Sequence, residues 1–169
     1  MKPHASAEDW RRKLGPRFDE FFVFCIVRNP FDHQVSLYEY IVGNNEHPLH
    51  SEVSKLSFPE FVQYRCQKGY RQQTEFIVDS SDGTALVDYV GRFETLAEDI
   101  DKISNHIGIS ITLPHKNASQ RKDISHYYDE ISITKTVEKS REDFENFGYS
   151  KNIYKPELTS IDLRVKKRQ

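Results

Sequence analysis

The sequence predicts an α/β fold whose strands pair in parallel. Residues 21–27 form a continuous apolar run, Phe-Phe-Val-Phe-Cys-Ile-Val, which is too short for a helix and is typical of a strand buried on both faces. Residues 86–90 form a second strand candidate, and segments with helical periodicity lie between the two runs. Buried strands that alternate with helices usually belong to a parallel sheet.

Capping residues and glycines predict where the helices begin and end. Ser, Thr or Asn accepts hydrogen bonds from the first turn of a helix, an acid three residues later completes a capping box, and Gly closes the last turn. These signals predict helices that begin after Ser6, Asn29, Ser57 and Thr95, with glycine ends at Gly15, Gly43 and Gly108. A further helix is expected from about residue 132, with Ile133, Val137, Phe144 and Phe147 on one face.

The remaining segments are predicted to be loops and a tail. The stretch 69–83 is polar, and so is most of the stretch 44–56, which marks both as loops. The last twenty or so residues are polar and are expected to fray. We therefore expect a single domain over residues 1–150 and a C-terminal tail over 151–169.

Composition narrows the classes of function. The 169 residues are 37% hydrophobic and 30% charged, with a net charge of −2, which is typical of a globular protein and not of a chain that binds polyanions through bulk charge. We therefore expect no nucleic-acid partner. The two cysteines, Cys25 and Cys66, are expected to be reduced thiols, and neither a metal-site spacing nor an apolar run long enough for a membrane span occurs in the sequence.

The turn over residues 28–36 has the chemistry of an anion site. A helix N-terminus presents unpaired N–H groups and a partial positive charge, and Pro30 fits the first helical position. Arg28 adds a planar guanidinium at the carboxyl end of the strand. Asn29, Asp32 or His33, and Ser36 repeat at about one helical turn and share a face, so the Ser36 hydroxyl can donate to the anion that Arg28 binds. The residues alone leave two interpretations equally open, namely phosphate binding and ordinary helix capping with Arg28 paired to a core carboxylate.

Four segments resemble the Golgi-type carbohydrate sulfotransferases and their bacterial relatives, in the order found in that family. They are residues 24–38, which contain Val-Arg-Asn-Pro-Phe-Asp and the later Val-Ser, residues 88–96 with Gly-Arg-Phe-Glu, residues 113–121 with Asn-Ala-Ser-Gln-Arg, and residues 127–149. The resemblance implies a three-layer, P-loop-like α/β fold with a central parallel sheet. It also implies a co-substrate, 3′-phosphoadenosine 5′-phosphosulfate (PAPS), and a hydroxyl-bearing acceptor such as a carbohydrate, without a metal.

The resemblance also assigns roles to individual residues. Arg28 and Ser36 would bind the 3′-phosphate of PAPS or of its product PAP, and Arg121 would be a further nucleotide contact unless it is a solvated surface arginine. Arg92 and Glu94 match the family motif, although a buried Arg–Glu pair that orders the loop explains them equally well. His4 is the candidate general base, because relatives have a histidine at the corresponding place.

The sequence departs from the family in one respect. The family's strand and Gly/Ser-rich loop, which hold the 5′-phosphosulfate, have no counterpart here, so we expect an N-terminally truncated enzyme or a short relative that has lost catalysis, with little turnover. A non-catalytic nucleotide-binding or interaction module is the alternative. An exposed sheet edge is expected to allow a homodimer. We expect a cytoplasmic protein if Met1 is the native start, and the Golgi lumen if the chain is a fragment of a membrane-anchored enzyme.

Overall fold

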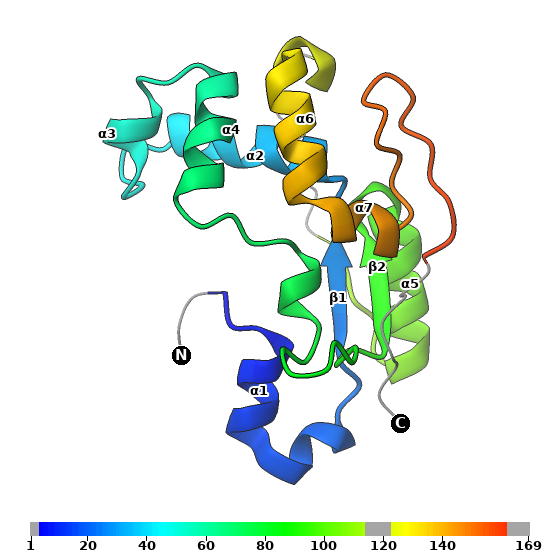
Figure 1. Ribbon diagram of the computed structural model, residues 1–169. Helices are drawn as coiled ribbons and strands as arrows, with labels where there is room; N and C mark the ends of the chain where they lie inside the picture. The colour runs from blue at the N-terminus through cyan, green and yellow to red at the C-terminus, as the bar shows by residue number, and fades with distance from the viewer. Residues whose placement is uncertain (1–3, 114–122, 162–169) are drawn as a thin grey trace.

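A computed structural model describes residues 4–113 and 123–161 of the chain (Figure 1). Helices are the main secondary structure, and two short strands lie among them. In chain order the elements are α1 (Ala7–Leu14), a 3₁₀ turn (Gly15–Glu20), β1 (Phe24–Val27), α2 (Pro30–Val42), α3 (His50–Val53), α4 (Phe58–Gln67), a 3₁₀ turn (Thr74–Phe76), β2 (Tyr89–Arg92), a 3₁₀ turn (Phe93–Thr95), α5 (Leu96–Ile107), a 3₁₀ turn (Ile124–His126), α6 (Glu130–Lys139) and α7 (Arg141–Asn146).

The sheet confirms the predicted α/β class. β1 and β2 pair in parallel, with Phe24 opposite Tyr89 and Val27 opposite Arg92, so the carboxyl ends of both strands lie at the same edge. The second strand starts three residues later than predicted and includes Gly91. A Cβ atom at Gly91 would lie 2.7 Å from Ile26 Cδ1 and 2.9 Å from Asp99 Cβ, so only glycine lets α5 pack this close to the sheet.

Most predicted helix ends are confirmed, because they depend on local contacts. Ser6 and Ser57 form capping boxes, and Asn29 Oδ1 accepts a hydrogen bond of 2.9 Å from the N–H of Phe31. The capping box predicted at Thr95 is wrong, because the Thr95 hydroxyl donates to Asp99 at 2.8 Å instead. The single helix predicted from residue 132 is two helices, α6 and α7, which meet at Ser140.

Aromatic side chains form the core, as their number in the sequence indicates. α2 lies against α4 and α6, with Phe31 and Phe61 fully buried between them (Figure 1). Phe31 contacts Tyr128 edge-on, with ring centroids 5.3 Å apart, and Phe144 of α7 lies 5.1 Å away. Ring packing of this kind contributes about 0.5–1.5 kcal/mol per pair beyond the buried area. It fixes the position of the first turn of α2.

The segment after α7 is more ordered than predicted. Tyr149 and Leu158 form an antiparallel bridge, and the N–H of Thr159 donates to the carbonyl of Gly148 at 2.9 Å. Residues 148–159 therefore fold back on the domain and do not fray. Within the described ranges, none of the helices is long and apolar enough to cross a membrane.

Candidate functional site

The candidate site lies where β1 ends and α2 begins. Asn29 caps the 13-residue α2, and Pro30 occupies its first position. Because β1 and β2 are parallel, the turn after β2, with Phe93 and Glu94, lies beside this helix start. Ligands of open α/β sheets collect at the carboxyl ends of strands, so the location fits a binding site.

Arg28 and Ser36 are in direct contact. The Arg28 guanidinium donates from Nη1 to Ser36 Oγ at 2.8 Å and from Nε to the carboxylate of Asp32. It also lies over the ring of Phe93, with 4.2 Å between Cζ and the ring centroid. The ion pair with Asp32 matches part of the capping interpretation, since Arg28 does have a carboxylate partner. The roles of Arg28 and Ser36 in binding stay predictions.

The arrangement leaves hydrogen-bonding capacity for a ligand. A guanidinium has five N–H donors, and the described residues accept from Nε and Nη1. Ser36 Oγ accepts from Arg28, so its own proton can still be donated. An oxyanion that meets Arg28 and Ser36 would therefore gain charge-assisted hydrogen bonds without breaking the contact between them.

The backbone of Arg28 is held from both sides by Gln73. Gln73 Oε1 accepts from the Arg28 N–H at 2.9 Å, and Gln73 Nε2 donates to the Arg28 carbonyl at 2.8 Å. Gln73 is itself fixed by buried Asp143, which accepts from its N–H at 2.9 Å. The sequence predicts no role for either residue. These partners lie 45 and 70 positions apart in the chain, so no local pattern could have found them.

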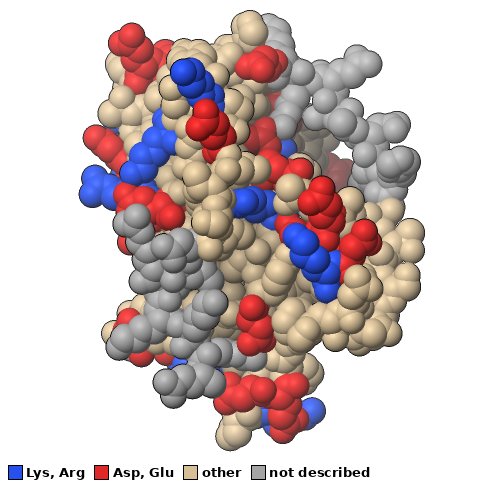
Figure 2. All heavy atoms as spheres, turned by 90° about the vertical axis from the view of Figure 1, so that its right-hand side faces the viewer, with Lys and Arg blue, Asp and Glu red and all other residues tan. Residues whose placement is uncertain are grey.

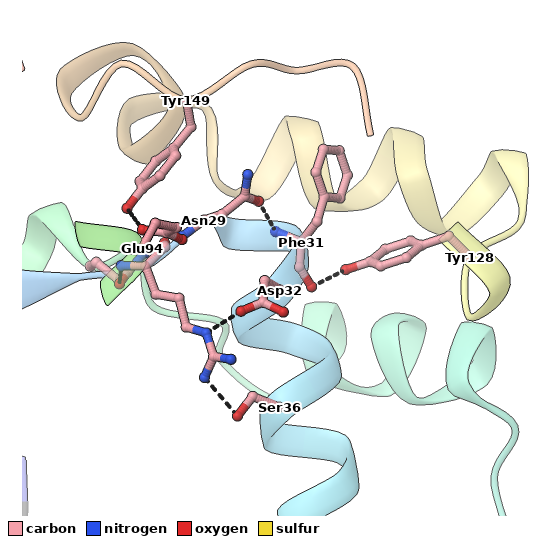
Figure 3. A network of polar contacts seen from close by, with 9 residues as sticks. Asn29, Phe31, Asp32, Ser36, Glu94, Tyr128 and Tyr149 are labelled. Carbon is pink, nitrogen blue, oxygen red and sulfur yellow. Dashed lines mark hydrogen bonds and ion pairs between the residues drawn. The ribbon is translucent and has the colours of Figure 1, made fainter. Parts of the chain in front are cut away.

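A second set of contacts holds the N-terminus of α2 (Figure 3). Glu94 accepts from the Asn29 N–H at 2.7 Å and from the Tyr149 hydroxyl at 2.8 Å. Tyr128 donates to the carbonyl of Phe31 at 2.9 Å. Segments after β2, α5 and α7 therefore all converge on the first turn of α2.

Arg92 and Glu94 do not form the buried pair that the sequence leaves open as an alternative explanation of these residues. Arg92 donates to the carbonyl of Phe147 at 2.6 Å and to that of Thr159, whereas Glu94 contacts Asn29 and Tyr149. Both residues order the surroundings of the site, but by contacts with different segments. Arg92 ends β2, whereas Glu94 lies in the 3₁₀ turn that follows it, so the alternation of a continuous strand does not apply to these two side chains.

A cavity of about 690 Å³ lies along β1, and two histidines line it. His4, the predicted base, is exposed, with a backbone φ of 65°. His33 is half-buried, and burial together with the charges of Arg65 and Arg28 lowers its pKa to about 4. Burial raises the pKa of Cys25 in the same wall to about 12, so this thiol is not a nucleophile at neutral pH. The third predicted nucleotide contact, Arg121, lies outside the described residues.

Residues 4–113 and 123–161 contain no group of three or more His, Cys, Asp or Glu side chains that could hold a metal ion. On the face seen in Figure 2, acidic and basic side chains of the described residues are interspersed. The positive charge at the candidate site comes from one side chain, that of Arg28.

A comparison of the chain with known proteins identifies one protein family. A model of the sulfotransferase family matches residues 3–150. A protein of Archaeoglobus fulgidus, described as uncharacterized, is 31% identical over 100 residues, which cover 59% of this chain and 78% of that protein. No solved structure matches the chain.

Proposed function

Because the chain belongs to the sulfotransferase family, we propose that the turn between β1 and α2 binds the 3′-phosphate of PAPS for transfer of its sulfuryl group to a hydroxyl of a carbohydrate or other small acceptor. The observation that supports this most is the hydrogen bond of 2.8 Å from Arg28 Nη1, at the end of β1, to Ser36 Oγ, in the middle of α2. A guanidinium and a hydroxyl held side by side can both donate hydrogen bonds to a phosphate dianion.

The residues around Arg28 would hold it ready for the phosphate. Gln73 fixes its backbone and Asp32 fixes Nε, so little side-chain freedom remains to be lost when the ligand binds. Phe93 covers one face of the guanidinium and limits the access of water to it. Arg28 and Ser36 would therefore act as a preformed pair.

In the proposed transfer, the bond between sulfur and the phosphate oxygen of PAPS breaks and a bond from sulfur to the acceptor oxygen forms. The acceptor hydroxyl loses its proton, and PAP leaves. We propose that His4 accepts this proton, since its imidazole borders the cavity beside β1 and an ordinary histidine is suited to neutral pH. His33 is a poorer base, because its lowered pKa of about 4 weakens its hold on a proton.

Calorimetry with adenosine 3′,5′-bisphosphate tests the binding. We expect wild-type protein to bind and Arg28→Ala to show no binding in the same range. Arg17→Ala is the matched control, because the Arg17 side chain is 71% exposed and pairs with Glu20 at the surface. No binding by the wild type at millimolar nucleotide, or equal binding by Arg28→Ala, would contradict the proposal.

A non-catalytic nucleotide-binding module is the second candidate. The sequence feature that favours it is the placement of the seven glycines, none of which lies in a Gly-rich phosphate loop between a strand and a helix. The two candidates differ in turnover of labelled PAPS with a panel of hydroxyl acceptors. Binding of the bisphosphate without turnover would favour the module, and turnover that His4→Ala abolishes would favour the enzyme.

A further inference from the structure

The cavity along β1 contains an arginine without a counterion. Arg65 of α4 lines this cavity, and its Nε is fully buried without a hydrogen-bond partner. Burial lowers the pKa of Arg65, and no carboxylate among the described residues offsets this effect. The residue as a whole is partly buried, so its charge is withdrawn in part from water without a counterion, which is costly.

The surroundings hold the guanidinium in place. Its Cζ lies 5.3 Å from the centroid of the Tyr70 ring. Tyr70 is fixed in turn, because its hydroxyl accepts from Gln34 at 3.1 Å and contacts the hydroxyl of Ser140. The face of an aromatic ring attracts a cation, which positions the group but leaves its donors unpaired.

The other charged groups at this cavity are already paired. Asp9 caps α1 and pairs with Arg12, and Arg71 pairs with Glu75 at 3.4 Å. His33 is neutral at physiological pH. The charge that remains uncompensated in the wall is therefore the positive charge of Arg65, which favours an anion in the cavity.

From this geometry, and on the basis of the proposed function, we infer that the cavity receives the acceptor, and that the acceptor carries an oxyanion, a carboxylate or a sulfate ester, which binds Arg65. The cavity is bordered by His4, the proposed base, so the acceptor hydroxyl has to reach this space. Arg28, the proposed ligand of the nucleotide, is not among the residues that line it. The volume of about 690 Å³ is in the range of sites for small molecules such as a sugar unit.

Arg65 would be a specificity-determining residue in this arrangement. A neutral sugar in the cavity would displace water from the Arg65 guanidinium without supplying a counterion, whereas an acidic sugar would supply one. A charge-assisted hydrogen bond to a guanidinium contributes about 1.5–3 kcal/mol, which corresponds to about tenfold or more in affinity.

Nuclear magnetic resonance of arginine Nε–H groups tests the inference directly. The probes are glucuronate for the carboxylate and glucose 6-sulfate for the sulfate ester, with glucose as the neutral control. We expect the Arg65 Nε–H signal, identified by its loss in Arg65→Lys, to shift with one or both acidic sugars and not with glucose. No shift with either acid up to about 50 mM, or the same shift with glucose, would overturn the inference.

Variants separate this site from the nucleotide site. Arg65→Gln should weaken binding of the acidic sugar about tenfold or more, Arg65→Lys should weaken it less, and the surface control Arg17→Gln should not change it. If Arg65→Gln and Arg65→Lys weaken the binding of adenosine 3′,5′-bisphosphate and leave the binding of the sugars unchanged, the cavity belongs to the nucleotide donor and the inference is wrong. The proposed function fails separately, by the absence of nucleotide binding in the wild type.

Discussion

Asp143 is the buried residue whose replacement should disturb the scaffold of the site most clearly. Its side chain accepts from the N–H groups of Gln73 and Thr74 at 2.9 and 2.8 Å and from the Thr74 hydroxyl at 2.9 Å. The residue is 1% exposed, so water cannot replace these partners. In Asp143→Asn the remaining oxygen can keep the two Thr74 contacts, but the NH₂ group that replaces the other oxygen then points a donor at the Gln73 N–H.

The expected loss of stability in Asp143→Asn follows from the polar groups that the substitution leaves unpaired. The buried N–H of Gln73 and the new NH₂ group each lose an acceptor, at about 1–3 kcal/mol apiece. Burial raises the pKa of Asp143, so removal of its charge returns part of this cost. We expect a net loss of about 2–3 kcal/mol in the free energy of unfolding, or about 5–10 °C in Tm.

Urea unfolding followed by circular dichroism measures this loss. The matched control is Glu142→Gln, the same acid-to-amide change at an exposed neighbour on α7, which should alter stability by less than about 0.5 kcal/mol. Because Gln73 also holds the Arg28 backbone, Asp143→Asn should weaken nucleotide binding as well. A change below about 1 kcal/mol in Asp143→Asn would refute the reasoning about buried donors.

The other predictions concern the acid limb of stability, the sheet and the phosphate contact. Burial opposes ionisation of Asp99, but hydrogen bonds from the Arg92 N–H and from three side chains hold its pKa well below the usual range. The contribution of ionised Asp99 to the free energy of unfolding is therefore present above about pH 4 and is lost as the pH falls further. Asp99→Asn should flatten the acid limb of a plot of unfolding free energy against pH, and an unchanged acid limb would contradict this prediction. Gly91→Ala should destabilise by about 1–3 kcal/mol in thermal unfolding, because its Cβ would overlap Ile26 and Asp99; wild-type stability would show that the sheet and α5 can separate at no cost. Ser36→Ala should lower the affinity for adenosine 3′,5′-bisphosphate by about three- to tenfold in calorimetry, since one hydrogen bond to the phosphate is lost. An affinity equal to that of the wild type would show that Ser36 does not contact the nucleotide.

The sequence predicts best what depends on neighbours in the chain. Ser36 is expected beside the anion that Arg28 would bind, because it shares a helical face with Asn29, the residue after Arg28. The helix starts at Ser6, Asn29 and Ser57 follow from capping chemistry. The second strand begins three residues late because its start depends on pairing with β1, not on hydrophobicity alone.

Long-range contacts account for what the sequence could not predict. Gln73 holds Arg28 across 45 positions, and Asp143 holds Gln73 across 70. In the sequence, Gln73 lies in a polar stretch and Asp143 in a segment with helical periodicity, and neither pattern indicates these contacts. Arg65 could not be recognised as unpaired, because its environment comes from Tyr70 and the wall of β1. Such partners are fixed by tertiary packing and leave no period or motif in the chain.

The most direct test of the central claim is the selectivity for a 3′-phosphate. Calorimetry should compare adenosine 3′,5′-bisphosphate with adenosine 5′-phosphate, which differ in that group alone, on wild type and on Arg28→Ala. Charge-assisted contacts from Arg28 predict that the wild type prefers the bisphosphate by about tenfold or more, and that Arg28→Ala loses this preference. Equal affinity of the wild type for the two nucleotides, or a preference that persists in Arg28→Ala, would contradict a 3′-phosphate site at the start of α2.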